Sequence, residues 1–211
     1  MNWQKRTKQW ERECVKTRRY LWLRRRRLKM FQISPNNKVL DLGCGDGLNI
    51  KLLNQMGISK VFGVDISSYL LKIAQKNNPQ TKFYLASAKK LPFKNGYFDV
   101  ILIDSTFYHF FDDPKSLIEI RRVLKKGGKL NFIEAHKSFL RKLIDKFTLS
   151  SFANYLPFFK GRQFAYMAEK ISLARWLEKE ETFLKSLWKY GFKKIFLKRD
   201  LLSIIGSYQR T

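Results

Sequence analysis

The sequence predicts an α/β fold in which a mostly parallel sheet carries helices on both faces. From Lys38 onward, short apolar runs alternate with stretches of helical periodicity, which is the pattern of repeated strand–helix–strand units. The apolar runs are nearly continuous, as expected for strands that are buried on both faces. With 211 residues, the chain is long enough to bury a substantial core in one domain of this class.

Ahead of the sheet, residues 3–31 are predicted to form a basic helix within an N-terminal extension that covers residues 1–35. Its apolar face is made of residues at helical spacing, namely Trp10, Cys14, Leu21 and Leu28. The other faces are largely cationic, and Ser34-Pro35 ends the helix. Two roles stay open for it: packing on the sheet or over a bound cofactor, or contact with anionic headgroups through tryptophans set among arginines.

The middle of the chain supplies most of the expected sheet. Strands are expected near 38–42, 60–65, 81–86, 98–103 and 129–134. Helices are expected near 46–56, 67–77 and 114–125. The last helix has signals at both ends, with Pro114 after two aspartates at its start and lysines followed by Gly127-Gly128 at its end.

The C-terminal part departs from the alternation. Residues 137–176 show aromatic-rich helical spacing that is interrupted at Pro157. Residues 178–190 are predicted to form a helix that ends at Gly191. The two apolar runs at 192–197 and 201–208 are predicted to form a closing antiparallel hairpin.

The composition excludes several classes of protein. Hydrophobic residues make up 45% of the chain and aromatic residues 15%, which separates it from disordered proteins. No run approaches the ~20 apolar residues of a membrane-spanning helix, and the N-terminus lacks the apolar stretch of a secretory signal. Two cysteines and two histidines without paired spacing predict neither a disulfide framework nor a metal site. A cytoplasmic protein, with peripheral membrane contact as an option, is the expectation.

The net charge of +26 is concentrated at the two ends of the chain. Residues 1–30 hold 12 Lys/Arg against 2 acids, and residues 137–211 hold 16 against 6. An anionic partner would explain this excess: a phospholipid surface, a phosphorylated or carboxylated small molecule, or RNA. Biased residue usage with lysines on solvated faces is the alternative, although the four consecutive arginines at 24–27 are hard to attribute to a lysine bias.

The most informative motif lies at residues 39–47, which read Val-Leu-Asp-Leu-Gly-Cys-Gly-Asp-Gly. Its three glycines allow a tight turn and the close approach of a ligand. The next strand ends at Asp65, where a carboxylate can accept hydrogen bonds from ribose hydroxyls. A nicotinamide-binding protein would carry a third glycine at position 48, which is Leu48 here.

Further blocks follow in order at 83–88, 91–93, 97–101 and 117–128. Together with the glycine turn, they resemble the class I S-adenosylmethionine-dependent methyltransferases, in the small-molecule and lipid branch. The resemblance covers residues 36–136, and Tyr155-Leu-Pro, Tyr190-Gly-Phe and residues 201–206 are similar to ubiquinone and menaquinone methyltransferases. It implies a Rossmann-like sheet of seven strands with an antiparallel C-terminal strand, in a single domain over 36–211. A helical substrate lid would span about 137–176.

The resemblance also implies a site for S-adenosyl-L-methionine. The implied cofactor-binding residues are Asp41, Gly43, Cys44, Gly45, Asp65, Ile66, Ser87, Ala88 and Asp104. Asp41 would serve the methionine end, whose ammonium calls for a carboxylate, with backbone contacts from residues 43–45; Asp65 would take the ribose diol. Ser87 stands where relatives usually carry an acid for the adenine amino group, so that contact falls to its hydroxyl or to the backbone N–H of Ala88.

Residues 104–109, Asp-Ser-Thr-Phe-Tyr-His, follow the fourth strand, where acceptor and methyl group would meet. Enzymes that methylate base amines carry two prolines inside this block, and Ser105 and Thr106 replace them here. His109 is the candidate general base, with pocket lining as its alternative role. Glu134 and His136 are second candidates.

The sequence thus predicts a methyltransferase that acts on an amphiphilic or anionic small molecule or lipid. Two alternatives remain: an RNA methyltransferase that docks through its basic flanks, and a non-catalytic cofactor-binding fold that acts as an RNA- or membrane-binding subunit.

Overall fold

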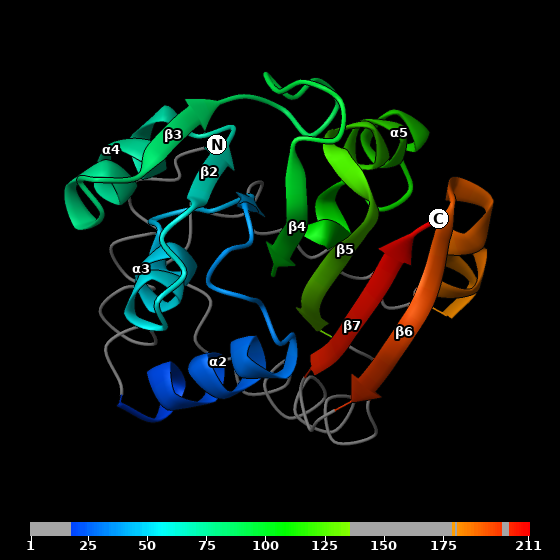
Figure 1. Ribbon diagram of the computed structural model, residues 1–211, viewed down its shortest axis with the longest axis horizontal. Helices are drawn as coiled ribbons and strands as arrows, with labels where there is room; N and C mark the ends of the chain where they lie inside the picture. The colour runs from blue at the N-terminus through cyan, green and yellow to red at the C-terminus, as the bar shows by residue number, and fades with distance from the viewer. Residues whose placement is uncertain (1–17, 136–178, 180, 200–202) are drawn as a thin grey trace, which may run out of the picture.

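The computed structural model describes residues 18–135, 179, 181–199 and 203–211, which form a seven-stranded sheet flanked by helices (Figure 1). The strands are β1 (Val39–Leu42), β2 (Val61–Asp65), β3 (Lys82–Leu85), β4 (Phe98–Asp104), β5 (Leu124–Ala135), β6 (Phe192–Arg199) and β7 (Ser203–Arg210). Helices α2 (Arg18–Met30), α3 (Leu48–Gln55), α4 (Ser68–Asn77) and α5 (Pro114–Val123) flank the sheet, with short 3₁₀ turns at Phe107–His109 and Leu187–Tyr190. The lid expected at 137–176, His136 and the helix before residue 18 lie outside the described residues.

The strand order is β3-β2-β1-β4-β5-β7-β6. The first five strands of this order pair in parallel, whereas β7 pairs antiparallel with both β5 and β6. Figure 1 shows β6 and β7 as an antiparallel pair at one edge of the sheet. The predicted fold class, including the antiparallel C-terminal strand, is confirmed.

Two apolar clusters cover opposite faces of the sheet, and alternate residues of the central strands divide between them. Leu40 and Ile101 join the cluster that contains α5 and the apolar residues of 183–187. Val39 and Val100 join the cluster that contains residues from α2, α3 and α4. Because successive side chains of a strand point to opposite faces, the continuous apolar runs of the sequence supply both cores.

The helix at 114–125 ends earlier than predicted. α5 stops at Val123, and Leu124 already pairs with Phe98 as the first residue of β5. The pairing is interrupted until Lys129 meets Val100, so the two glycines belong to an irregularity within β5, where Gly127 has φ +77°. The glycine signal was therefore real, but it marks a bulge instead of the helix end. At the other end the prediction is accurate, since Asp113 caps the helix and Pro114 begins it.

The remaining elements lie within one or two residues of their predicted positions. Ser67 is the N-cap of α4, and its hydroxyl accepts from the Leu70 backbone N–H at 3.3 Å. Residues 181–186 are helical and continue into the 3₁₀ turn, which ends at Gly191 with φ +74°. Within the described residues, no helix combines the length and apolar character that crossing a bilayer requires.

Candidate active site

A pocket of about 460 Å³ opens at the carboxyl ends of β1, β2 and β4. Its walls include the glycine turn from Gly43 to Asp46 on one side and the segment from Thr106 to Phe110 on the other. Asp65, Asp104 and Arg24 are the charged side chains that also line it. Ligands of open α/β sheets bind in this position, outside the carboxyl ends of the strands.

Backbone angles and close contacts explain why glycines occupy the turn at residues 43–45. Gly43 has φ +78°, and a Cβ there would lie 2.3 Å from the side chain of Thr106. Its N–H and that of Cys44 donate to the carbonyl of Val64 at 2.8 and 3.0 Å, which ties the turn to β2. Gly45 has φ +55°, and a Cβ on it would meet nothing within 4 Å. The first glycine is therefore required by protein packing, and Gly45 leaves open space toward the pocket.

Asp65 is held by backbone donors at the tip of β2. Its carboxylate accepts from the N–H of Gly45 at 2.9 Å and from the N–H of Ser67 at 2.8 Å. Burial raises the pKa of this carboxyl, while those two hydrogen bonds oppose the shift. The neighbouring Ile66 lines the same pocket with 70% of its surface exposed, an unusual exposure for a large apolar residue.

Asp104 is paired with an arginine that sequence analysis did not place in the site. The Nη2 and Nε atoms of Arg24 lie 2.7 and 2.8 Å from Oδ2 of Asp104. The Ser105 hydroxyl donates to the other oxygen, Oδ1, at 2.9 Å. Both partners of the ion pair are largely buried, which makes the pair a structural link between α2 and the end of β4.

Asp41, at the third position of β1, is fully buried and, unlike Asp65 and Asp104, is not among the residues that line the pocket. Among the described residues, neither of its carboxylate oxygens has a hydrogen-bond partner. Burial, reinforced by the charge of Asp104 and opposed by that of Arg24, raises the pKa of Asp41 to about 8. Such a group calls for a cationic or hydrogen-bonding partner, because an unpaired buried carboxylate is costly.

α2 reaches the pocket because its apolar residues anchor it to the sheet. Leu28 and Phe31 are buried in the cluster that also contains Val39 and Ile50, and Arg24 precedes Leu28 by one turn. The helix thus packs over the pocket through this face, while Trp22 remains 60% exposed. The spacing of Arg24 from Leu28 was the available signal that this arginine belongs to the inner face.

The segment after β4 separates buried from accessible side chains. Ser105 has φ +57°, a strained conformation for a residue with a side chain, at the point where the chain turns into the pocket. Phe107 is fully buried and packs against Phe132 and Phe183. His109 is exposed at the pocket wall, with its ring centroid 4.1 Å from that of Tyr108.

Glu134 supports this segment from below and does not line the pocket. Its Oε1 accepts from the Phe107 backbone N–H at 2.5 Å, and its side chain is buried. Burial raises the pKa of Glu134 to about 8. The structure therefore places it as a support for the 107–109 turn, whereas His109 faces the pocket.

At the remaining corner, Ala86 and Ala88 line the pocket. Ser87, which lies between them, is exposed and is not part of the lining. Its hydroxyl accepts from the Lys89 backbone N–H at 3.3 Å, within a short turn. Ala88 is therefore the nearer candidate for a contact with a ligand at this corner.

Comparison with known proteins agrees with this geometry. Residues 40–132 match the family described as a methyltransferase domain. A demethylmenaquinone methyltransferase of Thermotoga maritima is 29% identical over 180 residues, which cover 83% of this chain and 78% of that protein. A demethylmenaquinone methyltransferase of Chlorobaculum tepidum is 32% identical over 173 residues, which cover 79% of this chain and 69% of that protein.

A solved structure shares the fold. The S-adenosylmethionine-dependent methyltransferase of Aquifex aeolicus superimposes with a TM-score of 0.64 at 18% identity, and the alignment covers 89% of each chain. At this identity the likeness concerns the architecture alone.

Proposed function

This chain belongs to the class I S-adenosylmethionine-dependent methyltransferases, and we propose that its methyl acceptor is an amphiphilic aromatic compound of the quinol type. Its membership and its use of a small-molecule acceptor follow from the family match and from relatives that extend over most of the chain. The observation that carries the choice of acceptor is the similarity to demethylmenaquinone methyltransferases over 79% and 83% of the chain.

The pocket fits the cofactor on several independent features. Asp65 is positioned to accept from the ribose hydroxyls, and the open space at Gly45 admits a ligand close to the backbone. The exposed side chain of Ile66 supplies an apolar surface for the adenine ring, and Ala88 supplies a contact at its edge. The unpartnered carboxylate of Asp41 suits the ammonium of the methionine end, through direct or water-mediated contact.

Arg24 adds a role that the sequence pattern did not suggest. Its guanidinium lines the pocket beside Asp104, so that a cation and a carboxylate stand side by side. The methionine end of the cofactor carries an ammonium and a carboxylate, which is the complementary arrangement. We infer that Arg24 receives the carboxylate of the cofactor and Asp104 contributes to holding the ammonium.

On the acceptor side, His109 is the exposed histidine among the described residues that line the pocket. When bound, S-adenosylmethionine supplies an electrophilic methyl group on a sulfonium that departs as a neutral thioether. The imidazole of His109 would accept the proton from a ring hydroxyl of the acceptor, which increases electron density at the neighbouring ring carbon. That carbon would form the new C–C bond as the C–S bond breaks, and its own proton would then move to the ring oxygen, which restores the aromatic hydroquinone and leaves the hydroxyl proton on His109. Tyr108 and Phe110 flank it with aromatic surface. Orientation of the two reactants by these walls can contribute about 7–11 kcal/mol to the lowering of the barrier.

Methylation of a base amine is the weaker alternative. In the corresponding block an aromatic residue would stack on the flipped base, but Phe107 is fully buried against Phe132 and Phe183. Phe107 therefore belongs to the core, and positions 105 and 106 hold Ser and Thr instead of the two prolines of base-amine methylases.

Contact with an anionic membrane is compatible with the exposed Trp22 and the arginines beside it, and would bring the enzyme to a lipid acceptor.

The test is a transfer assay with methyl-labelled cofactor and three acceptors: a short-chain prenyl naphthohydroquinone, total RNA and phospholipid vesicles. We expect label on a ring carbon of the quinol, located by fragmentation in mass spectrometry. His109→Gln should lower kcat about 100-fold and remove the acidic limb of the pH profile, while affinity for S-adenosylhomocysteine stays within threefold. Label that appears in RNA or phospholipid would contradict the acceptor proposed. Unchanged kcat in the variant would leave His109 as pocket lining.

A further inference from the structure

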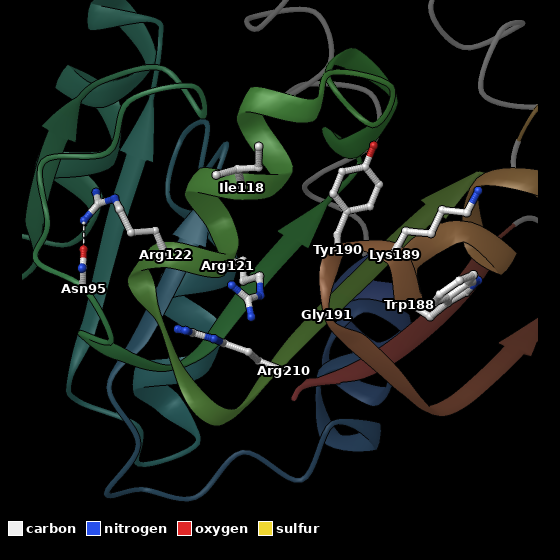
Figure 2. A pocket seen from close by; sticks show the side chains of 9 residues that line it. All are labelled: Asn95, Ile118, Arg121, Arg122, Trp188, Lys189, Tyr190, Gly191 and Arg210. Atoms are coloured by element: carbon white, nitrogen blue, oxygen red, sulfur yellow. Dashed lines mark hydrogen bonds between the residues drawn. The ribbon is translucent and has the colours of Figure 1, made fainter.

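A second pocket, of about 780 Å³, lies toward the amino ends of the parallel strands, away from the cofactor site at their carboxyl ends. Figure 2 shows the residues that line it. It is formed by the C-terminal part of α5, the 187–190 turn and the end of β7. The strand register fixes its position. Gln209 pairs with Lys129, which pairs with Val100 near the start of β4. The neighbouring Arg210 is therefore at the amino end of the parallel strands, whereas Asp104 ends β4 at the cofactor site.

Two arginines face this pocket, and neither has an acidic partner among the described residues. Figure 2 shows the guanidinium groups of Arg121, from α5, and Arg210, from β7, turned toward the same space. No aspartate or glutamate is among the described residues that line it. The nearby Glu119 is occupied, because both of its oxygens accept from Arg122 at 2.7 Å.

Arg210 is the more constrained of the two. Its Nη1 donates to the Leu124 carbonyl, while its Nε is buried and has no hydrogen-bond partner among the described residues. Burial and then the charge of Arg121 lower the pKa of Arg210. The Arg121 side chain packs directly against Gly191, where a Cβ would lie 2.6 Å from the Arg121 Nε. The site thus holds two close cations that an anion would relieve.

Apolar surface surrounds this charge. Trp188 is 68% exposed and Ile118 is 60% exposed, and both line the pocket together with Tyr190. In Figure 2, Tyr190 and Ile118 lie nearer to Arg121, and Trp188 lies on the other side of Gly191. Apolar and aromatic side chains in the same pocket as the arginines form a mixed surface that suits a ligand with an anionic part and a planar part.

We propose that this pocket binds a nucleotide unit, with its phosphate on Arg121 and Arg210 and its base against Tyr190. Arginine forks match phosphate oxygens, and aromatic side chains stack on bases of any sequence. The volume is that of a small-molecule pocket, and its concave shape favours a discrete ligand over a flat lipid surface. The nucleotide unit is supplied either as a free nucleotide or as part of a single-stranded RNA.

The experiment measures binding of UMP, uridine and inorganic phosphate by calorimetry to the full chain saturated with S-adenosylhomocysteine, so that the cofactor pocket is occupied. We expect saturable one-to-one binding of UMP, at least about tenfold tighter than that of uridine. A labelled oligouridylate, followed by fluorescence anisotropy, separates the two sources. RNA as the source predicts an oligomer that binds at least tenfold tighter than UMP, and a free nucleotide predicts no such gain.

Arg121→Gln should weaken UMP about tenfold or more, because one charged fork is lost. Arg25→Gln removes the same charge from an exposed position on α2 and should change UMP affinity less than twofold. Tyr190→Leu should weaken binding of UMP but leave binding of inorganic phosphate unchanged. Unchanged affinity for S-adenosylhomocysteine in each variant shows that the fold is intact.

Three results would overturn the site: no saturable UMP binding, equal losses in Arg121→Gln and Arg25→Gln, or preferential binding to anionic phosphatidylglycerol vesicles that UMP does not displace.

Discussion

The two pockets at the ends of the parallel strands differ in charge. At the carboxyl ends, Asp65 and Asp104 line the cofactor pocket near the buried Asp41, and Arg24 is the one arginine among the described residues of the lining. At the amino ends, Arg121 and Arg210 face a pocket whose described lining contains no acid. A chain with a net charge of +26 therefore keeps a local acidic site, and S-adenosylmethionine, whose sulfonium and ammonium outweigh its carboxylate, is a cation.

The difference between the two ends has a physical cause. Residues at the carboxyl ends are fixed by backbone donors and by the one ion pair, which keep ionisable groups in place where water is scarce. At the amino ends, Arg121 lies near the end of α5 and Arg210 ends β7, and exposed side chains surround them. Net charge alone thus does not predict what a given surface of this protein binds.

The largest expected effect comes from breaking the acidic end at Asp65. Asp65→Ala should weaken S-adenosylmethionine and S-adenosylhomocysteine by about 2–3 kcal/mol, because both ribose hydroxyls lose a charged acceptor. Calorimetry measures the change. Asp99→Asn is the matched control, since Asp99 lies at the other end of the strands and pairs with Lys125 at 2.6 Å. Unchanged affinity in Asp65→Ala would remove the ribose assignment.

The second prediction concerns protonation at the acidic end. The pKa of Asp41 is about 8 in the folded protein and the usual 3.8 when unfolded, so the folded state binds the extra proton between these values. The free energy of unfolding of the cofactor-free protein should therefore fall as pH rises from 4 to 8, and then level off. At pH 9, Asp41→Asn should raise the free energy of unfolding by roughly 2 kcal/mol relative to the parent protein.

Urea unfolding between pH 5 and 9 measures this slope. Glu134, whose pKa is also raised to about 8 by burial, should retain part of it in the variant. Asp99 provides the contrast, because its hydrogen bond and ion pair with Lys125 lower its pKa in spite of burial. The stabilisation that ionised Asp99 contributes is lost only below about pH 4. Asp99→Asn should therefore leave the pH dependence of the free energy of unfolding between pH 5 and 9 unchanged. A parent protein without a slope would show that Asp41 is ionised in the fold.

A third, smaller effect tests the arginine at the acidic end. Arg24→Gln should weaken S-adenosylmethionine about tenfold, or about 1.4 kcal/mol, because the cofactor carboxylate loses its guanidinium. Decarboxylated S-adenosylmethionine, which lacks that group, should lose less than twofold, and Arg25→Gln should affect neither ligand. Equal losses for both ligands would mean that Arg24 acts only through Asp104.

The residues in these predictions make contacts that are close together or far apart along the chain. That separation determined which site residues could be predicted from the sequence. The glycine turn and Asp65 were predicted because a local pattern of strand, turn and strand brings them together. Arg24 was missed as a site residue because its partner Asp104 is 80 positions away. The one indication in the sequence was its spacing of one helical turn from Leu28, which places Arg24 on the buried face of the helix.

The second pocket was harder still to foresee. Arg121 and Arg210 meet because β7 inserts between β5 and β6, which brings the end of the chain beside α5. No local periodicity encodes that insertion. The sequence indicated only an excess of positive charge and a closing hairpin. The end of α5 was misjudged for a related reason: pairing of Leu124 with Phe98 overrode the local glycine signal.

The smallest expected effect is a reversal of charge at the basic end. Arg121→Glu would place a carboxylate beside Arg210, so that repulsion between two cations becomes attraction. Because Arg121 is exposed, water screens most of the gain, and we expect a rise in Tm of only about 1–2 °C at low salt. The difference should shrink in 0.5 M NaCl, since salt screens surface charges. Arg25→Glu, which makes the same change at an exposed site on α2, controls for the lower net charge. An equal rise in both variants would attribute the effect to net charge, and the two arginines at the amino ends of the strands would then not repel each other measurably.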